Sequence, residues 1–344
     1  MRVRLRDVAE RAGVSVKTVS NVVNGYVHVA PDTRARVQTV LEETGYRPNL
    51  TARRLRAGRT GLVALALPEL DNPYFAELTR FVVEAAAERG WTVLVDQTDG
   101  LAERERAVAS GFRDHLIDGL ILSPAAVARE DLEARAHDDI PLVLLGEKLG
   151  VGPHDHVAID NVAAARTATE HLLEQGRRRV AALGHQPDST SGSGVAHLRR
   201  RGWEEALTEA GFDAETALVA EVPSFRLEDG AAAMAALLDD ARPDAVFCFN
   251  DTLALGALRT LADRGLRVPQ DVAVIGIDDV AEGRYAVPRL STIAPDKRGI
   301  AHTAVALLAD RLGAADHPTT GPREVRADFE LVARESTLGR TAPV

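Results

Sequence analysis

From residue 61 onward the chain repeats one pattern, in which short apolar runs alternate with stretches of helical spacing at intervals of about thirty residues. This alternation is typical of βαβ units, because parallel strands need a long crossover between them. The candidate strands are 62–67, 92–96, 119–122, 141–145, 157–159, 180–183, 218–222, 245–249, 272–277 and 291–293. Ten strands are more than a single sheet usually holds, so we expect two doubly wound lobes with a ligand site at the carboxyl ends of their strands.

The length and composition indicate no membrane role. The chain has 344 residues, of which 45% are hydrophobic, and no apolar run approaches the length that spans a bilayer. The charged N-terminus lacks the apolar stretch of a secretory signal, so we expect a cytoplasmic protein. The single cysteine, Cys248, lies in an apolar run and is expected to be an inert core thiol.

The charge is divided unevenly along the chain. Residues 1–60 carry a net charge of +7 and the remainder −17, which together give the formal net charge of −10. A basic segment at one end of an acidic chain is the electrostatic pattern expected for binding a phosphate backbone.

The first sixty residues predict three small helices. Residues 5–12 have helical spacing, and Gly13 interrupts the pattern before Ser15, which can cap a second helix. Valines recur along one side of that second helix and leave a short polar face on the other. A third helix is expected over 31–43, with Gly45 as its stop. A helix, a tight turn and a polar second helix suit the major groove, although a plain helical bundle would share the pattern.

The residues themselves go further than the pattern. The segment LRDVAERAGVSVKTVSNVVNG (5–25), continued by DTRARV (32–37) and GYRPN (45–49), resembles the headpiece of the lac repressor (LacI/GalR) family of bacterial transcriptional regulators. The resemblance implies that base edges are read by Val16, Lys17, Ser20 and Asn21. It implies phosphate contacts for Ser15, Thr18, Asn24 and Thr33. Many relatives carry arginine where this chain has Asn21, so the operator sequence stays open.

Residues 49–58 form a basic segment that is too short to be a stable isolated helix. By resemblance it is the family's hinge helix, which orders on operator DNA and inserts a leucine, here Leu55, into the minor groove. The DNA-contacting residues implied for it are Asn49, Ala52, Leu55 and Arg56. The alternative is a flexible basic linker.

The resemblance extends over the remaining chain through the segments 160–161, 199–203, 249–256, 274–279 and 288–293. It implies an α/β fold in which a three-helix helix-turn-helix headpiece (1–46) and a hinge (47–60) precede a two-lobed periplasmic-binding-protein-like core of doubly wound parallel sheets. The expected N-subdomain comprises 61–162 and 293–322. The expected C-subdomain comprises 163–292 and 323–344.

Polar and aromatic residues at strand ends mark a candidate effector site: Asn72, Phe75, Ser123, Asn250 and Asp278. The resemblance adds Arg199 and Phe225. A carboxylate, a guanidinium, amides and aromatic faces together suit a mono- or oligosaccharide. The alternatives are that the asparagines cap helices, the phenylalanines belong to the core and the arginine to a solvated basic cluster. Ala294-Pro295 replaces a polar position of some sugar-responsive relatives.

The expected function is a cytoplasmic, nucleoid-associated transcriptional repressor that binds a palindromic operator as a homodimer and responds to a small molecule, with a sugar as first choice. A regulator responding to a nucleoside or nucleobase, or an α/β enzyme, are the alternatives. The motifs GxxxxGK[ST], GxSxG and HExxH do not occur in the sequence, so we expect no catalytic residue, metal or cofactor. No leucine heptad tail follows the core, which favours a dimer over a tetramer.

Overall fold

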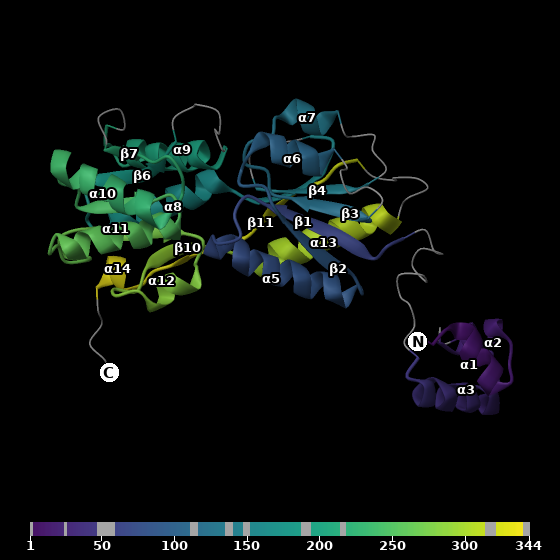
Figure 1. Cartoon of the computed structure of the whole chain (residues 1–344). Coiled ribbons are helices and arrows are strands. Elements are labelled where there is room, and N and C mark those ends of the chain that lie inside the picture. Colours follow the sequence, from purple (N-terminus) through teal and green to yellow (C-terminus); the bar gives the residue numbers. More distant parts are fainter. Residues whose placement is uncertain are drawn as a thin grey trace. The chain divides into compact units, whose positions relative to one another are not determined.

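The computed structural model describes residues 3–23, 26–46, 59–110, 116–134, 140–146, 152–186, 194–213, 218–313 and 321–339. The chain divides into two compact units, Met1–Thr60 and Gly61–Val344 (Figure 1). Within the described residues no helix is long and apolar enough to cross a membrane.

The N-terminal unit is a three-helix headpiece. Its helices are α1 (Leu5–Ala12), α2 (Val16–Val23) and α3 (Pro31–Thr44). The turn between α1 and α2 requires φ of +64° at Gly13, a left-handed conformation that glycine adopts without strain. Among the described residues of this unit, the fully buried core consists of valine and alanine side chains: Val8, Ala9, Ala12, Val19, Val22, Val37 and Val40. The predicted helix-turn-helix and third helix are confirmed.

The first lobe of the larger unit is built on a parallel sheet in the order β11-β5-β4-β3-β1-β2. Its strands are β1 (Leu62–Leu67), β2 (Thr92–Gln97), β3 (Gly119–Leu122), β4 (Leu142–Leu145), β5 (Asp155–Ile159) and β11 (Glu324–Ala327). Its helices are α5 (Pro73–Glu88), α6 (Ala102–Ala109), α7 (Arg129–Glu133) and α13 (Lys297–Gly313).

Helices cover both faces of this sheet, with α5 and α13 on one side and α6 and α7 on the other (Figure 1). The side chains of β1 alternate between the two layers. Val63, Leu65 and Leu67 pack in the cluster of α5 and α13, whereas Ala64 and Ala66 pack in that of α6 and α7. Burial on both faces explains why this strand reads as a continuous apolar run.

The second lobe repeats the plan with the order β12-β10-β9-β8-β6-β7. Its strands are β6 (Val180–His185), β7 (Val219–Glu221), β8 (Ala245–Cys248), β9 (Ala273–Ile277), β10 (Ser291–Pro295) and β12 (Phe329–Val332). Its helices are α8 (Asn161–Glu174), α9 (Gly194–Glu209), α10 (Leu227–Asp240), α11 (Asp251–Asp263), α12 (Ala281–Tyr285) and α14 (Glu335–Leu338). All strand pairs are parallel except β10 with β12.

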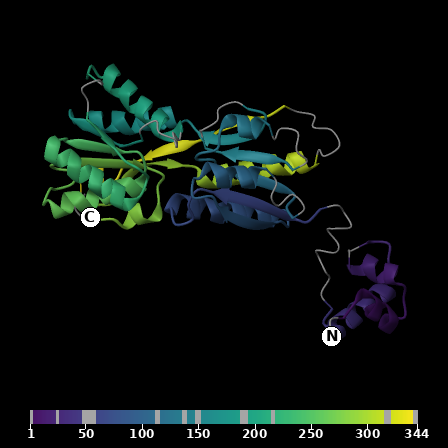
Figure 2. The ribbon, with the colours of Figure 1, turned by 45° about the horizontal axis from the view of Figure 1, so that its top comes forward.

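The chain crosses between the lobes three times, after β5, after β10 and between β11 and β12. Figure 2 shows the last crossing as the yellow segment that runs from one lobe into the other. The second and third crossings lie later than the sequence-based boundaries after 292 and 322. The reason is that β10 stays in the second sheet up to Pro295, while β11, up to Ala327, pairs with β5 of the first.

Candidate functional site

The helix α2 presents two different sides. Val19 and Val22 are buried against the rest of the headpiece. On the other side Val16 is 45% exposed and Lys17 is exposed, followed one turn later by Ser20 and Asn21, which are half-buried. These four residues, for which base contacts are implied, therefore share the face of the helix that lies opposite Val19 and Val22.

The start of α2 is capped by its own side chains. The Ser15 hydroxyl accepts a hydrogen bond from the Thr18 amide at 3.0 Å and lies 2.8 Å from the Thr18 hydroxyl. Ser15 is thus the predicted N-cap, and both hydroxyls lie at the N-terminal end of the helix. Thr33 is half-buried in the first turn of α3. Asn24, Asn49, Ala52, Leu55 and Arg56 lie outside the described residues.

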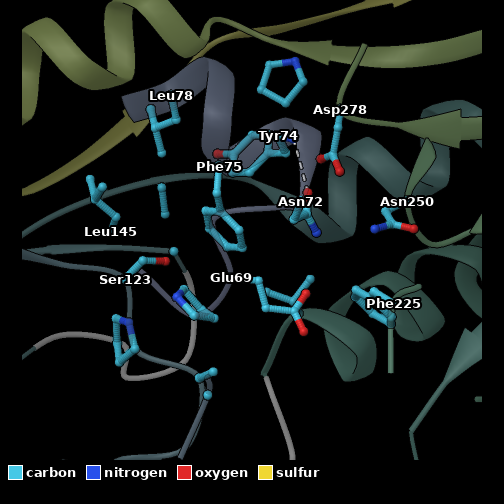
Figure 3. A pocket seen from close by; sticks show the side chains of 18 of the residues that line it. Glu69, Asn72, Tyr74, Phe75, Leu78, Ser123, Leu145, Phe225, Asn250 and Asp278 are labelled. Carbon is cyan, nitrogen blue, oxygen red and sulfur yellow. Dashed lines mark hydrogen bonds between the residues drawn. The ribbon is translucent and has the colours of Figure 1, made fainter. Parts of the chain in front are cut away.

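In the larger unit a cavity of about 340 Å³ lies between the two lobes. Side chains from the first lobe, among them Phe75 and Ser123, lie opposite Phe225, Asn250 and Asp278 of the second (Figure 3). All seven candidate effector residues line this one cavity: Asn72, Phe75, Ser123, Arg199, Phe225, Asn250 and Asp278. They meet because both sheets direct the carboxyl ends of their strands toward it.

Asn72 and Asn250 do cap helices, as the structural alternative held. The side-chain oxygen of Asn72 accepts from the Tyr74 amide at 3.0 Å, and that of Asn250 accepts from the Leu253 amide at 2.8 Å. Both residues nevertheless line the cavity. Capping uses the carboxamide oxygen, so the two roles do not compete for the carboxamide NH₂ group.

Arg199 is not part of a solvated cluster, because its side chain is only 8% exposed. Its Nε donates to Asn161 Oδ1 at 2.6 Å, and Nη1 donates to the carbonyl of Phe249. Its Nη2 lies 3.9 Å from Oδ1 of Asp278, which is too long for a direct hydrogen bond. A ligand hydroxyl between them can accept from the guanidinium and donate to the carboxylate.

Asp278 is almost completely buried. Burial raises the pKa of its carboxyl to about 6, against the opposing effects of Arg199 and Lys297, while the nearby Glu77 adds to the rise. At neutral pH the group is therefore mostly ionised and acts as a hydrogen-bond acceptor.

Cys248 is also fully buried, which raises the pKa of its thiol, in agreement with an inert core residue.

Aromatic faces complete the cavity. Phe75, Tyr74 and Phe225 are half-buried and line it. Tyr74 and Phe75 pack edge to face with their ring centroids 5.3 Å apart. Pro295, in the segment where the chain departs from some sugar-responsive relatives, is also a lining residue and adds apolar surface.

Several lining residues were not in the predicted set, including Glu69, Asp99 and Gln186. Each follows the end of a strand, so the rule that located Asn72 and Ser123 would have found them. Glu69 of the first lobe also accepts a hydrogen bond from Arg226 of the second at 2.9 Å. This ion pair joins the two lobes beside the cavity.

Two family models match the chain. The model described as bacterial regulatory proteins, lacI family, matches residues 4–49, and the model described as a periplasmic binding protein-like domain matches residues 169–337.

Relatives are similar to this chain over nearly its whole length. The HTH-type transcriptional regulator DegA of Bacillus subtilis is 32% identical, with 98% of each chain covered. The HTH-type transcriptional regulator CelR of Thermobifida fusca is 36% identical, covering 97% of this chain and 98% of the relative. The HTH-type transcriptional repressor PurR of Erwinia tasmaniensis is 34% identical, with 90% of each covered.

Several solved structures are also similar to this chain. A LacI family regulator from Sanguibacter keddieii is 47% identical, with a TM-score of 0.73, covering 82% of this chain and 100% of that chain. A CelR–cellobiose complex is 34% identical, with a TM-score of 0.71, covering 97% and 100%. The lac repressor dimer bound to operator and the anti-inducer ONPF is 27% identical, with a TM-score of 0.84, covering 98% and 100%.

The relatives are transcriptional regulators and not enzymes, which excludes the enzyme alternative. The chain belongs to the lacI family of bacterial regulatory proteins and is a DNA-binding transcriptional regulator with a periplasmic-binding-protein-like core.

Proposed function

We propose that this regulator is a repressor that acts in the cytoplasm, at the nucleoid, binds a palindromic operator as a homodimer and is controlled by a sugar in the core cavity. The observation that carries the sugar assignment is the 3.9 Å separation of Arg199 and Asp278 in a cavity with aromatic walls. Sugar hydroxyls need paired donors and acceptors, and the C–H faces of the ring need an apolar surface. The cellobiose complex of a relative that covers 97% of this chain supports the assignment.

The proposed operator reader is the exposed face of α2. Lys17, Ser20 and Asn21 carry donors and acceptors for base edges, and Val16 offers an apolar contact. The hydroxyls of Ser15, Thr18 and Thr33 would hold phosphates and set the register. Two headpieces in a symmetric dimer require a palindromic site.

The proposed dimer surface is the apolar patch formed by Tyr285 and Val287. Tyr285 is 86% exposed and Val287 is 77% exposed, which makes them the two most exposed large apolar side chains among the described residues of the larger unit. A second copy of the chain is the proposed occupant, as in the dimeric lac repressor structure. Val287→Glu is expected to yield monomers in analytical ultracentrifugation. The matched control Leu227→Glu alters a leucine that is 51% exposed elsewhere and should leave the dimer intact.

The proposed hinge lies outside the described residues, and its role follows from the family resemblance. Leu55 is proposed to insert into the minor groove, which kinks DNA. Leu55→Ala is expected to weaken specific operator binding far more than nonspecific binding. An equal loss of specific and nonspecific binding would contradict the proposed insertion of Leu55 into the minor groove.

The proposed control works through the relative orientation of the two lobes. A sugar that contacts both lobes favours one orientation, and in the dimer this changes the spacing of the two hinges. Coupling of about 1 to 3 kcal/mol would change operator affinity roughly 5- to 150-fold. Linkage requires the operator to change sugar affinity by the same factor.

The decisive experiment is selection of genomic DNA fragments by the purified full-length protein. The best fragment is then titrated at several salt concentrations with cellobiose, ribose, glucose, adenosine and hypoxanthine. A palindromic site whose affinity shifts with a sugar supports the proposal, and the sign of the shift separates an inducer from a corepressor.

A shift with adenosine or hypoxanthine alone would favour the nucleoside or nucleobase alternative, for which the faces of Tyr74, Phe75 and Phe225 provide stacking surfaces. Binding that is salt-sensitive but independent of sequence would contradict the operator proposal.

A further inference from the structure

The turn that follows β9 has a strained backbone. Asp278 has φ of +122° and Asp279 has φ of +49°, although neither is glycine. Residues with a Cβ atom adopt these conformations only when their surroundings hold them. The strain lies at the residue whose carboxylate faces the effector cavity.

The ammonium group of Lys297 binds this turn from the first lobe, in addition to contacts within the second lobe such as the ion pair of Arg334 with Asp279. Its Nζ donates to the carbonyl of Asp278 at 2.7 Å and to that of Asp279 at 3.1 Å. It also lies 2.5 Å from Oε2 of Glu77. An ammonium has three donors, so these three acceptors satisfy it completely. The Lys297 side chain is only 7% exposed, which strengthens each of these interactions.

Glu77 extends the contact to the end of the turn. Its second oxygen, Oε1, accepts from the amide of Ala281 at 3.0 Å, at the first residue of α12. Lys297 begins α13 and Glu77 lies in α5, and both helices belong to the first lobe. The turn 278–281 belongs to the second lobe, so the two side chains hold it from across the interface.

We propose that Lys297 and Glu77 form a cross-lobe clamp on the turn 278–281, which positions the Asp278 carboxylate for the effector and makes that position depend on the orientation of the lobes. The inference rests on the proposed function in taking Asp278 as an effector ligand. Lys297 and Glu77 do not line the cavity, so they are positioning residues.

The structure offers a matched control for the clamp. Arg298, next to Lys297 in α13, also pairs with a glutamate of α5, with Nη2 3.1 Å from Oε2 of Glu84. It links the same two helices but donates no hydrogen bond to the turn 278–281 in the part of the chain that the structure describes. Arg298→Met therefore removes an α5–α13 ion pair without touching the clamp.

The first test is hydrogen–deuterium exchange of residues 278–285 in the ligand-free, full-length protein. Lys297→Met leaves two carbonyls and Glu77 without their donor, so exchange there should become about 10- to 100-fold faster. Glu77→Gln keeps an acceptor for Ala281 and should have a smaller effect. Arg298→Met should match the wild type.

The second test is titration of the same proteins with cellobiose from pH 5 to 8. Lys297→Met should weaken binding about tenfold or more and move the pH midpoint upward, because the ammonium stabilises the ionised Asp278. Lys297→Arg should restore part of the affinity, since its planar fork keeps the charge but reaches fewer of the three acceptors. If Lys297 had a merely structural role, the pH midpoint of cellobiose binding would stay the same in Lys297→Met.

The outcomes separate the two proposals. If Lys297→Met and the wild type exchange equally fast in 278–285, the clamp is wrong even when cellobiose binds. If the wild type does not bind cellobiose, the choice of that sugar fails, and the exchange experiment still decides whether the clamp exists. Thermal unfolding of each variant shows whether it is folded.

Discussion

The recognition face of α2 and the core cavity hold their polar groups in opposite ways. Val16 and Lys17 lie exposed on a headpiece in which the fully buried core residues that the structure describes are valines and alanines. Arg199, Asn250 and Asp278 are each less than 10% exposed and engage neighbouring groups within the core.

The difference teaches how each surface gains specificity. The headpiece face is free to change because folding does not depend on it, so substitutions there should alter binding alone. The cavity is preorganised by the same contacts that stabilise the core, so substitutions there should alter binding and stability together.

The largest effect is expected for Arg199→Met. The substitution removes one of the two cations that act on Asp278 and leaves the acceptors of Asn161 and Phe249 without their Arg199 donor, so the free energy of unfolding of the core should fall by about 3 kcal/mol. Chemical denaturation measures it. The control Arg201→Met lies on the same helix with its side chain 65% exposed and should have no measurable effect. Equal unfolding curves for the two variants would contradict the conclusion that the contacts of the cavity also stabilise the core.

Val19→Ala should destabilise the headpiece by about 2 kcal/mol, because it removes packing from a small core in which seven of the described residues are fully buried. Operator binding should weaken, whereas the unfolding transition of the core should not change. Val16→Ala provides a matched control on the same helix, since Val16 is 45% exposed and its loss should change stability by less than about 0.5 kcal/mol. Calorimetry of the full chain distinguishes the two transitions.

Asn21→Ala should lower affinity for the selected operator by about 1 to 3 kcal/mol without changing the unfolding of the headpiece. Its side chain lies on the face of α2 opposite Val19 and Val22. Binding titrations on the operator and on random DNA provide the measurement. Gln38→Ala, at an exposed position of α3, serves as the control. A loss of equal size on random DNA would show that Asn21 contacts only phosphates.

The smallest effect is expected from pH. The carboxyl of Asp278 has a pKa of about 6 and faces Arg199, Lys297 and Glu77. Sugar affinity should therefore fall, by at most about tenfold per pH unit, as pH drops below 6 and the acceptor is protonated. Because this pKa is raised from its ordinary value of 3.8, the stability contributed by the group falls as pH rises from about 4 to about 6. Asp278→Asn should abolish the pH dependence of sugar affinity and remove the contribution of this group to the pH dependence of stability. The contribution of Asp251 should remain, since burial and the nearby Asp278 raise its pKa to about 7.

All ten predicted strands occur in the structure, and most of them are buried apolar runs, although β2 and β7 are partly exposed edge strands. The strands β11 and β12 were not predicted. They are short edge strands in which half-exposed apolar residues are interspersed with charged ones, as in Glu324–Ala327. Such segments read as surface loop, and only pairing with a distant strand defines them.

The candidate site shows the same division. Asn72, Ser123, Asn250 and Asp278 could be located because a parallel sheet brings its strand ends together. The contacts that hold these residues in place could not be predicted from the sequence, because Lys297 and Glu77 lie 220 positions apart and no local pattern connects them. The left-handed φ of Asp278 is likewise a property of the assembled lobes.

Because the chain crosses between the lobes three times, three segments of the backbone join them, whereas two ordinary domains are joined by a single linker. A single proteolytic cut at any crossing leaves the lobes joined through the other two. Ending the chain after residue 296 removes α13 and β11 from the first lobe and β12 from the second. Neither lobe can therefore be exchanged by one recombination event, whereas the headpiece, which joins the core at a single point in the sequence, can be exchanged by one.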